Sequence, residues 1–276
     1  MSPARPRRRG KTAGVTRRVA VMGAAGRMGR AVCAAVVGDP DTELVAAVDP
    51  HHAGLDLTSV VGVPTDVVVA ADVRSLDDAG VDVAVDFTEA SAARANLRWC
   101  AGAGVHAVVG TTGLDERDLD ELRGLFSSSN CVVAPNFAIG AVLMMRLAEL
   151  AAPWFESVEI IELHHDAKVD APSGTAMLTA QRIAAASSEW APDPTVDTVV
   201  EGARGGRGPA GIPIHAVRLR GLVAHQEVLF GTTGQTLSIR HDTTDRSSFM
   251  PGVLLAVKAV AGRPGVTLGL EALLGL

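Results

Sequence analysis

The N-terminal part of the chain contains a turn rich in glycine between an apolar run and a segment of small residues. The apolar run is residues 19–22, the glycines stand at positions 23, 26 and 29, and residues 31–37 have the composition of a helix. Glycine permits a tight turn and close helix packing here, so that the helix N-terminus can meet the pyrophosphate of a dinucleotide. The commoner pattern also has glycine at position 25, which is alanine in this chain. Such a triplet is a weak signal alone, but it predicts a strand, a turn and a helix at the start of the fold.

A second apolar run, residues 43–48, ends in Asp49, about twenty residues after the last glycine. An acid at this place can accept hydrogen bonds from the ribose hydroxyls of an adenosine, although a strand-end turn residue beside Pro50 is the simpler alternative. Together with the glycine turn it indicates a nicotinamide cofactor. Pro50 stands where an arginine often binds the extra phosphate of NADPH, and Arg27 is a partial substitute, so the choice between NADH and NADPH stays open.

Strands and helices continue to alternate as far as residue 137. The expected strands are residues 82–87, 107–109 and 131–134, and the expected helices are 91–103 and 115–128. This alternation predicts a doubly wound parallel sheet, in which ligands lie off the carboxyl ends of the strands. The polar residues after three strands would then line one crevice, with ordinary turn chemistry as the alternative. They are Phe87 and Thr88, residues 110–112, and residues 134–137.

The pattern changes after residue 137. Expected there are helices at 139–152 and 174–188, a loop at 192–209, and strands at 158–163, 212–219, 226–230 and 235–240. They predict a second, α+β domain with an open mixed sheet, whose exposed apolar face is a candidate oligomer surface. An apolar helix at 247–261 and a strand at 266–270 are expected to return to the first domain. The predicted division is a disordered basic leader at 1–17, a first domain at 18–137 with 246–276, and a second domain at 138–245.

Residues 162–176 hold a concentration of groups that can handle protons and bind anions. The apolar run 158–163 predicts a strand with Ile160 and Leu163 inside, so that His164 and His165 fall at its end. Imidazole titrates near neutrality, and Lys168 can act as a general acid when partly desolvated. Ser173 is a good N-cap, and the helix turn after it would offer free N–H groups to a carboxylate. The alternative without a functional role is that one histidine packs in the core, Lys168 is a solvated loop residue and Ser173 only caps a helix.

Composition and charge exclude several classes of protein. Of the 276 residues 47% are hydrophobic, and the net charge is −6 although the leader is basic, so no nucleic-acid partner is expected. No run approaches the roughly 18 to 20 apolar residues of a membrane helix, and the run after Arg17 and Arg18 is too short for an export signal. The three cysteines lack metal-like spacing and are interpreted as reduced core residues of a cytoplasmic protein.

A metal site is not expected at His164, His165 and Asp166. Neighbouring side chains of a strand point to opposite faces, so one ion could hardly reach both histidines. A cysteine-based aldehyde mechanism is also disfavoured, because no cysteine lies in a polar loop beside a histidine. Two other classes of protein are compatible with a nicotinamide-binding first domain. One is a different two-domain NAD(P) dehydrogenase, and the other is a cofactor sensor without catalysis.

Taken together, these motifs resemble the 4-hydroxy-tetrahydrodipicolinate reductase (dihydrodipicolinate reductase) family from Arg18 onward. The segments that carry the resemblance are residues 23–29, 86–88, 109–113, 134–140 and, most specifically, 162–176. The resemblance implies an oxidoreductase with a Rossmann-type cofactor domain, a hinge, and a second domain whose sheets associate into a homotetramer. It implies NAD(P)H-dependent hydride transfer to a small cyclic dicarboxylate, giving tetrahydrodipicolinate in diaminopimelate and lysine biosynthesis.

The same resemblance assigns roles to individual residues. It makes His164 the proton donor and acceptor and Lys168 a proton donor, and it gives the substrate carboxylates to His165, Gly174 and Thr175. The expected cofactor, NADH or NADPH or both, would contact Gly23, Ala24, Ala25, Gly26, Arg27, Met28, Asp49, Gly110, Thr111, Thr112, Ala134, Pro135, Asn136 and Phe137.

Overall fold

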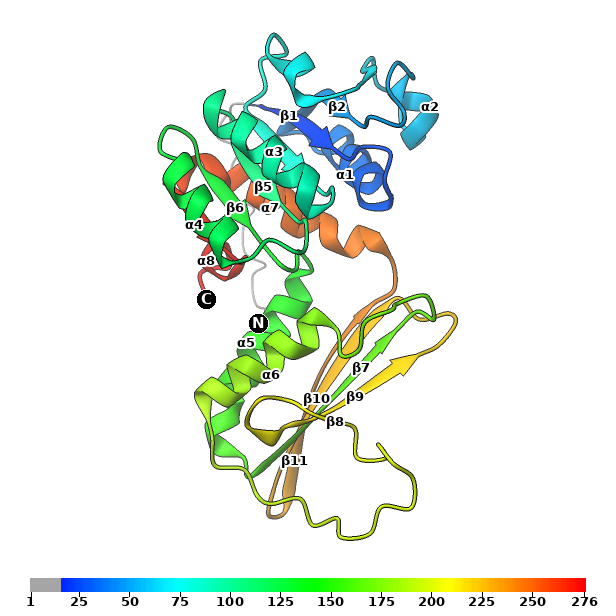
Figure 1. Cartoon of the computed structure of the whole chain (residues 1–276), viewed down its shortest axis with the longest axis vertical. Helices are drawn as coiled ribbons and strands as arrows, with labels where there is room; N and C mark the ends of the chain where they lie inside the picture. Colours follow the sequence, from blue (N-terminus) through cyan, green and yellow to red (C-terminus); the bar gives the residue numbers. More distant parts are fainter. Residues whose placement is uncertain (1–15) are drawn as a thin grey trace, which may run out of the picture.

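The computed structural model describes residues 16–276, and the predicted leader therefore lies almost wholly outside the described residues. The chain forms two units, each built on one sheet, that follow one another along the long axis of the molecule (Figure 1). No helix among residues 16–276 is long and apolar enough to cross a membrane.

The first unit is built on a seven-stranded sheet in the order β12-β6-β5-β4-β1-β2-β3, and each pair of neighbouring strands is parallel. The predicted doubly wound parallel sheet is confirmed. Its elements are β1 (Arg17–Met22), α1 (Arg27–Gly38), β2 (Thr42–Val48), α2 (Leu57–Val61), β3 (Val69–Ala70), η1 (Val73–Leu76), β4 (Val83–Asp86), α3 (Ala90–Gly102), β5 (His106–Val109), α4 (Glu116–Leu125) and β6 (Cys131–Val133).

Both faces of this sheet are covered, which explains why its strands are apolar throughout rather than alternating. In β1, Val19 and Val21 belong to a core shared with α1, while Ala20 and Met22 belong to a core shared with α3 and α4. The three cysteines are free and buried, as expected for core residues.

The second unit is a five-stranded mixed sheet in the order β11-β10-β7-β9-β8, and the predicted open mixed sheet is confirmed. Strand β7 is central, antiparallel to β10 and parallel to β9. Helices α5 and α6 cover one face through a core that includes Ala148, Ile183 and Phe230. The elements are α5 (Ile139–Ala151), η2 (Ala152–Trp154), β7 (Ser157–His164), α6 (Gly174–Ala186), β8 (Gly206–Arg207), η3 (Pro209–Gly211), β9 (Pro213–Arg218), β10 (Ala224–Thr232) and β11 (Gln235–Thr243).

The C-terminal segment returns to the first sheet, where α7 contacts α1 and β12 pairs with β6 (Figure 1). It consists of η4 (Arg246–Phe249), α7 (Met250–Ala259), η5 (Val260–Gly262), β12 (Val266–Leu268) and α8 (Glu271–Leu274). The sequence pattern placed the start of α1 four residues late, because the helix begins within the glycine turn. It also missed α2, β3, β8 and α8, which are too short to have a clear period, and β8 lies within the segment 192–209 that was predicted to be a loop.

Candidate active site

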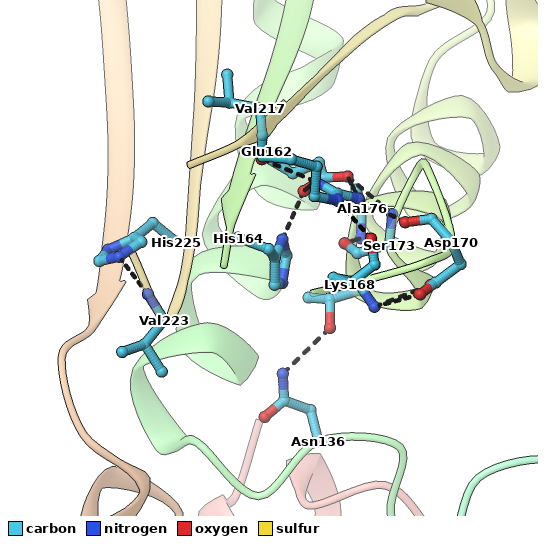
Figure 2. A network of polar contacts seen from close by, with 12 residues as sticks. Asn136, Glu162, His164, Lys168, Asp170, Ser173, Ala176, Val217, Val223 and His225 are labelled. Atoms are coloured by element: carbon cyan, nitrogen blue, oxygen red, sulfur yellow. Dashed lines mark hydrogen bonds and ion pairs between the residues drawn. The ribbon is translucent and has the colours of Figure 1, made fainter. Parts of the chain in front are cut away.

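The histidine and lysine motif forms the end of β7, the loop that follows it, and the first turn of α6. Figure 2 shows His164, Lys168 and Ser173 on this side of the second sheet, with Asn136 of the first unit facing them. The side chain of Asn136 donates from Nδ2 to Oγ1 of Thr175 over 3.2 Å. A residue expected to contact the cofactor and one expected to contact the substrate therefore meet across the two units.

Strand β7 turns Glu162 inward, and the prediction that Leu163 lies inside is wrong. The buried residues of β7 are Val158, Ile160 and Glu162, because side chains alternate along a strand, and Leu163 is only partly buried. The side chain of Glu162 is 0% exposed. Sequence reasoning missed this residue, although the period of two that starts at Val158 includes it.

Glu162 is an ionised carboxylate that accepts four hydrogen bonds. Arg218 donates from Nη2 to Oε1 and from Nη1 to Oε2, both over 2.8 Å. The backbone N–H of Ser173 donates to Oε1 over 3.1 Å, and Nδ1 of His164 lies 2.5 Å from Oε2. Burial acts to raise the pKa of Glu162, but the hydrogen bonds from His164 and Arg218 outweigh it and lower the pKa to about 2.

Lys168 lies in the loop after β7, partly buried, and its Nζ donates to both carboxylate oxygens of Asp170, over 2.8 and 2.9 Å. The backbone N–H of Lys168 donates to the carbonyl of His165, which closes a turn after the strand. His165 lies just past the end of β7, as the sequence predicted.

The first turn of α6 begins as predicted, with the Oγ of Ser173 accepting from the N–H of Ala176 over 3.2 Å. Gly174 and Thr175 are the first two residues of the helix, so their N–H groups belong to the turn that carries the positive end of the helix dipole. A small cavity of about 40 Å³ next to this turn is lined by residues from both units. They include Asn136, His164, Thr175, Gln226 and His241.

The glycine turn of the first unit fits a dinucleotide. Gly23 has φ +75°, a conformation that L side chains rarely adopt, and a Cβ on Gly29 would lie 2.0 Å from the carbonyl oxygen of Gly23. Gly26 is the N-cap of α1 and has no side chain to satisfy the first turn, which leaves room for a phosphate. Ala24 and Ala25 are buried, whereas Arg27 is exposed and Met28 partly so.

Asp49 lies where a ribose-binding acid is expected, at the end of β2. Its Oδ2 accepts from the N–H of Ala25 over 3.2 Å, and its Oδ1 lies 3.0 Å from Nδ1 of His52. Burial acts to raise the pKa of Asp49, but hydrogen bonds from His52, His51 and Ala25 hold it below its usual value. A carboxylate has about four acceptor positions, so it retains capacity for hydroxyl groups.

The other predicted cofactor residues lie after β5 and β6, at the carboxyl edge of the parallel sheet. Thr111 donates to Oδ1 of the buried Asp86 over 2.8 Å. A Cβ on Gly110 would lie 2.1 Å from the ring of Phe87, whose centroid is 5.5 Å from that of Phe137. Of the remaining predicted residues, the buried ones are Ala134 and Phe137, and the exposed ones are Thr112 and Pro135.

Other polar side chains near the site were not expected. Arg218 reaches Glu162 from β9, and no local sequence signal marks it. His225 is fixed between Asp242, 2.7 Å from its Nδ1, and the N–H of Val223, 3.3 Å from its Nε2. Within residues 16–276, no three His, Cys, Asp or Glu side chains are grouped so as to hold a metal ion.

A parallel nucleotide-binding sheet that faces a histidine, a lysine and a capped helix start defines a nicotinamide-dependent oxidoreductase of two units. The family model described as dihydrodipicolinate reductase, N-terminus, matches residues 17–137, and the one described as dihydrodipicolinate reductase, C-terminus, matches residues 140–274. The chain belongs to the dihydrodipicolinate reductase family.

Individual relatives are similar to this chain over nearly its whole length. The 4-hydroxy-tetrahydrodipicolinate reductase of Nocardia farcinica is 50% identical over 269 residues, covering 95% of this chain and 100% of its own. That of Cutibacterium acnes is 52% identical over 264 residues, covering 94% and 99%. The dipicolinate-bound dihydrodipicolinate reductase from Paenisporosarcina sp. TG-14 superimposes with a TM-score of 0.82 at 43% identity, covering 93% of this chain and 99% of that one.

Proposed function

We propose that this chain catalyses the NAD(P)H-dependent reduction of 4-hydroxy-tetrahydrodipicolinate to tetrahydrodipicolinate, in diaminopimelate and lysine biosynthesis. The observation that carries the proposal is the grouping of His164, Lys168 and the first turn of α6 opposite Asn136 of the nucleotide-binding unit. Full-length similarity to reductases of that name, and to one with dipicolinate bound, supports a small dicarboxylate as the substrate.

The residues of the second unit bind the substrate and supply its proton. His165 and the N–H groups around Gly174 and Thr175 hold the two carboxylates, because the helix start favours negative charge. Replacing the 4-hydroxyl group of the substrate by hydrogen consumes one hydride and one proton and releases one water, and His164 and Lys168 supply that proton. Lys168 is suited to this role, since the only partner of its Nζ among the described residues is the exposed carboxylate of Asp170, which a substrate can displace.

The residues of the first unit hold the cofactor, whose nicotinamide C4 supplies the hydride when it is bound. The turn from Gly23 to Met28 receives the pyrophosphate and Asp49 the adenosine ribose. Residues 110–112 and 134–137 line the crevice beside the nicotinamide. Asp49 favours NADH and the exposed Arg27 favours NADPH. The chain thus carries one feature for each cofactor, and the ratio of kcat/KM values ranks them.

The proposal includes the organisation of the chain and its assembly. The units are residues 18–137 with 246–276, and 138–245, after a leader at 1–17. Four copies associate through the face of the second sheet that α5 and α6 leave open, which mass measurement by light scattering tests (Figure 1). Three free, buried cysteines support a cytoplasmic location.

The test is an assay at 340 nm with enzymatically generated 4-hydroxy-tetrahydrodipicolinate and either NADH or NADPH. Cofactor oxidation should require this substrate, and Lys168→Ala should lower kcat about 100-fold or more while leaving cofactor affinity unchanged. Cofactor binding without oxidation would refute the proposed reaction and favour another dehydrogenase substrate or a sensor. Full turnover by Lys168→Ala at saturating substrate would refute the role of the lysine.

A further inference from the structure

We propose that the buried ion pair of Glu162 and Arg218 positions both proton-transferring side chains: the carboxylate fixes the tautomer of His164, and the guanidinium holds the loop that carries Lys168. The inference rests on the proposed function for its effect on turnover, but its effect on His164 stands on the contacts alone. Neither residue belongs to the set of site residues expected from the sequence.

The carboxylate determines which nitrogen of His164 carries a hydrogen. Glu162 is ionised and can only accept, and its Oε2 lies 2.5 Å from Nδ1 of His164. Nδ1 therefore donates in both the neutral and the charged ring, and Nε2 is the atom that gains or loses a proton. Figure 2 shows the rest of the ring turned away from Glu162, toward the side where Asn136 and Lys168 lie.

The same carboxylate also fixes the start of α6. Its Oε1 accepts from the N–H of Ser173, the N-cap, over 3.1 Å. Gly174 and Thr175 follow directly, so the orientation of the proposed carboxylate-binding turn depends on Glu162 as well. One buried group thereby sets the distance between the histidine and the anion-binding turn.

The guanidinium extends the arrangement to the lysine loop. Beyond Glu162, Arg218 donates from Nε to the carbonyl of Lys168 over 3.3 Å and from Nη2 to the carbonyl of Asp170 over 2.5 Å. These two carbonyls belong to Lys168 itself and to Asp170, the residue whose carboxylate binds Nζ of Lys168. A planar guanidinium with five N–H groups can make such contacts at once, whereas a lysine could not.

Stability alone does not account for such a pair. Burying two charges is costly, and well-packed apolar residues of the same volume often stabilise a protein as much or more. The arrangement makes sense when the pair also orients groups that must meet a ligand.

The first test is Glu162→Gln. An amide oxygen in place of Oε1 still accepts from Nη2 of Arg218 and from the N–H of Ser173, but the NH2 group then faces Nη1 of Arg218 and Nδ1 of His164. The hydrogen of the neutral ring therefore moves to Nε2. In protein with ¹⁵N-labelled histidine, the neutral His164 signals should change from the Nδ1–H to the Nε2–H pattern, with His164→Asn identifying them. We expect kcat to fall about tenfold or more, with KM within about threefold.

Glu159→Gln is the matched control. Glu159 also lies on β7 and binds one histidine and one arginine, but it contacts neither His164 nor the lysine loop. This variant should keep the His164 signals and kcat of the wild type. An unchanged His164 tautomer in Glu162→Gln, or an equal loss of kcat in both variants, would overturn the proposal.

Arg218→Lys tests the role proposed for the guanidinium. It also keeps the proposal testable if Glu162→Gln does not fold. Lysine keeps a positive charge beside Glu162, so the His164 tautomer should be retained while kcat falls because the carbonyls of Lys168 and Asp170 are released. Wild-type kcat in this variant would refute the role of Arg218. If the wild type does not reduce 4-hydroxy-tetrahydrodipicolinate, the proposed function fails, while the ¹⁵N spectra still decide the role of Glu162.

Discussion

Strand β7 carries two glutamates, Glu159 and Glu162, each of which binds one arginine and one histidine. Glu162 binds Arg218 and His164, and Glu159 binds Arg204 and His215. Residues three apart on a strand lie on opposite faces, so the first group lies under α6 and the second on the open face of the sheet. The side chain of Glu162 is 0% exposed, and that of Glu159 is 31% exposed.

The difference in burial determines what each group does. Within one copy of the chain, Glu159, with Arg204 and Asp193, lines an open cavity of about 580 Å³ beside the loop after α6, where water can solvate the charges. There the ion pairs tie a loop to the sheet. Glu162 is closed off from water, and its four donors come from β7, β9 and the start of α6. The same three residue types thus form partly exposed ion pairs on one face and, on the other, a buried group that contacts the residues proposed to transfer protons.

The largest expected effect comes from truncating each glutamate. Glu162→Ala leaves the N–H of Ser173 and the guanidinium of Arg218 without their buried acceptor, and removal of one member of a buried pair costs about 3 to 5 kcal/mol. Glu159→Ala should cost about 1 kcal/mol or less, because water replaces the lost partner. Thermal melts at equal protein concentration measure both. Equal losses would mean that burial does not separate the two groups.

The pH dependence of stability should also differ between the group around Glu162 and the group around Glu159. The pKa of Glu162 is lowered from 4.5 to about 2 in the folded chain, so its stabilising contribution is present above pH 4.5 and is lost as the pH falls toward 2. The difference in melting temperature between the wild type and Glu162→Gln should therefore shrink across this range.

Glu159→Gln supplies the reference for that titration. The pKa of Glu159 is also below its usual value, because hydrogen bonds from Arg204 and His215 outweigh the effect of burial. We expect a smaller change over the same pH range, since the group is partly exposed and screened. Carboxylates elsewhere in the chain are common to all three proteins and cancel in the differences. A constant difference for Glu162→Gln would show that its charge is not what stabilises the fold.

Sequence reasoning named the residues that are proposed to transfer protons, but not the buried Glu162 and the partly buried Arg218 that contact them. The glycine turn, the strand–helix alternation and the cap at Ser173 are local patterns, and the structure has all three. Arg218 could not be found in this way, because its place beside Glu162 depends on the parallel register in which His164 pairs with Arg218. Glu162 was not among the predicted inside or site residues, because a buried carboxylate looks like a surface one in the sequence until its partners are known.

The smallest expected effect comes from Asp170→Asn, which removes a third carboxylate in the same region. Asp170 binds Nζ of Lys168, but its side chain is 56% exposed, against 0% for Glu162. Exposed ion pairs contribute about 0 to 1 kcal/mol, and salt weakens them further. Thermal melts should therefore show a loss below about 1 kcal/mol that decreases in 1 M NaCl. If Asp170→Asn instead destabilised the chain as much as Glu162→Ala, at any salt concentration, the contrast between the two faces of β7 would owe nothing to exclusion of water. The hydrogen bonds made by Arg218 would then be the remaining explanation for the difference in stability between the Glu162 and Glu159 variants.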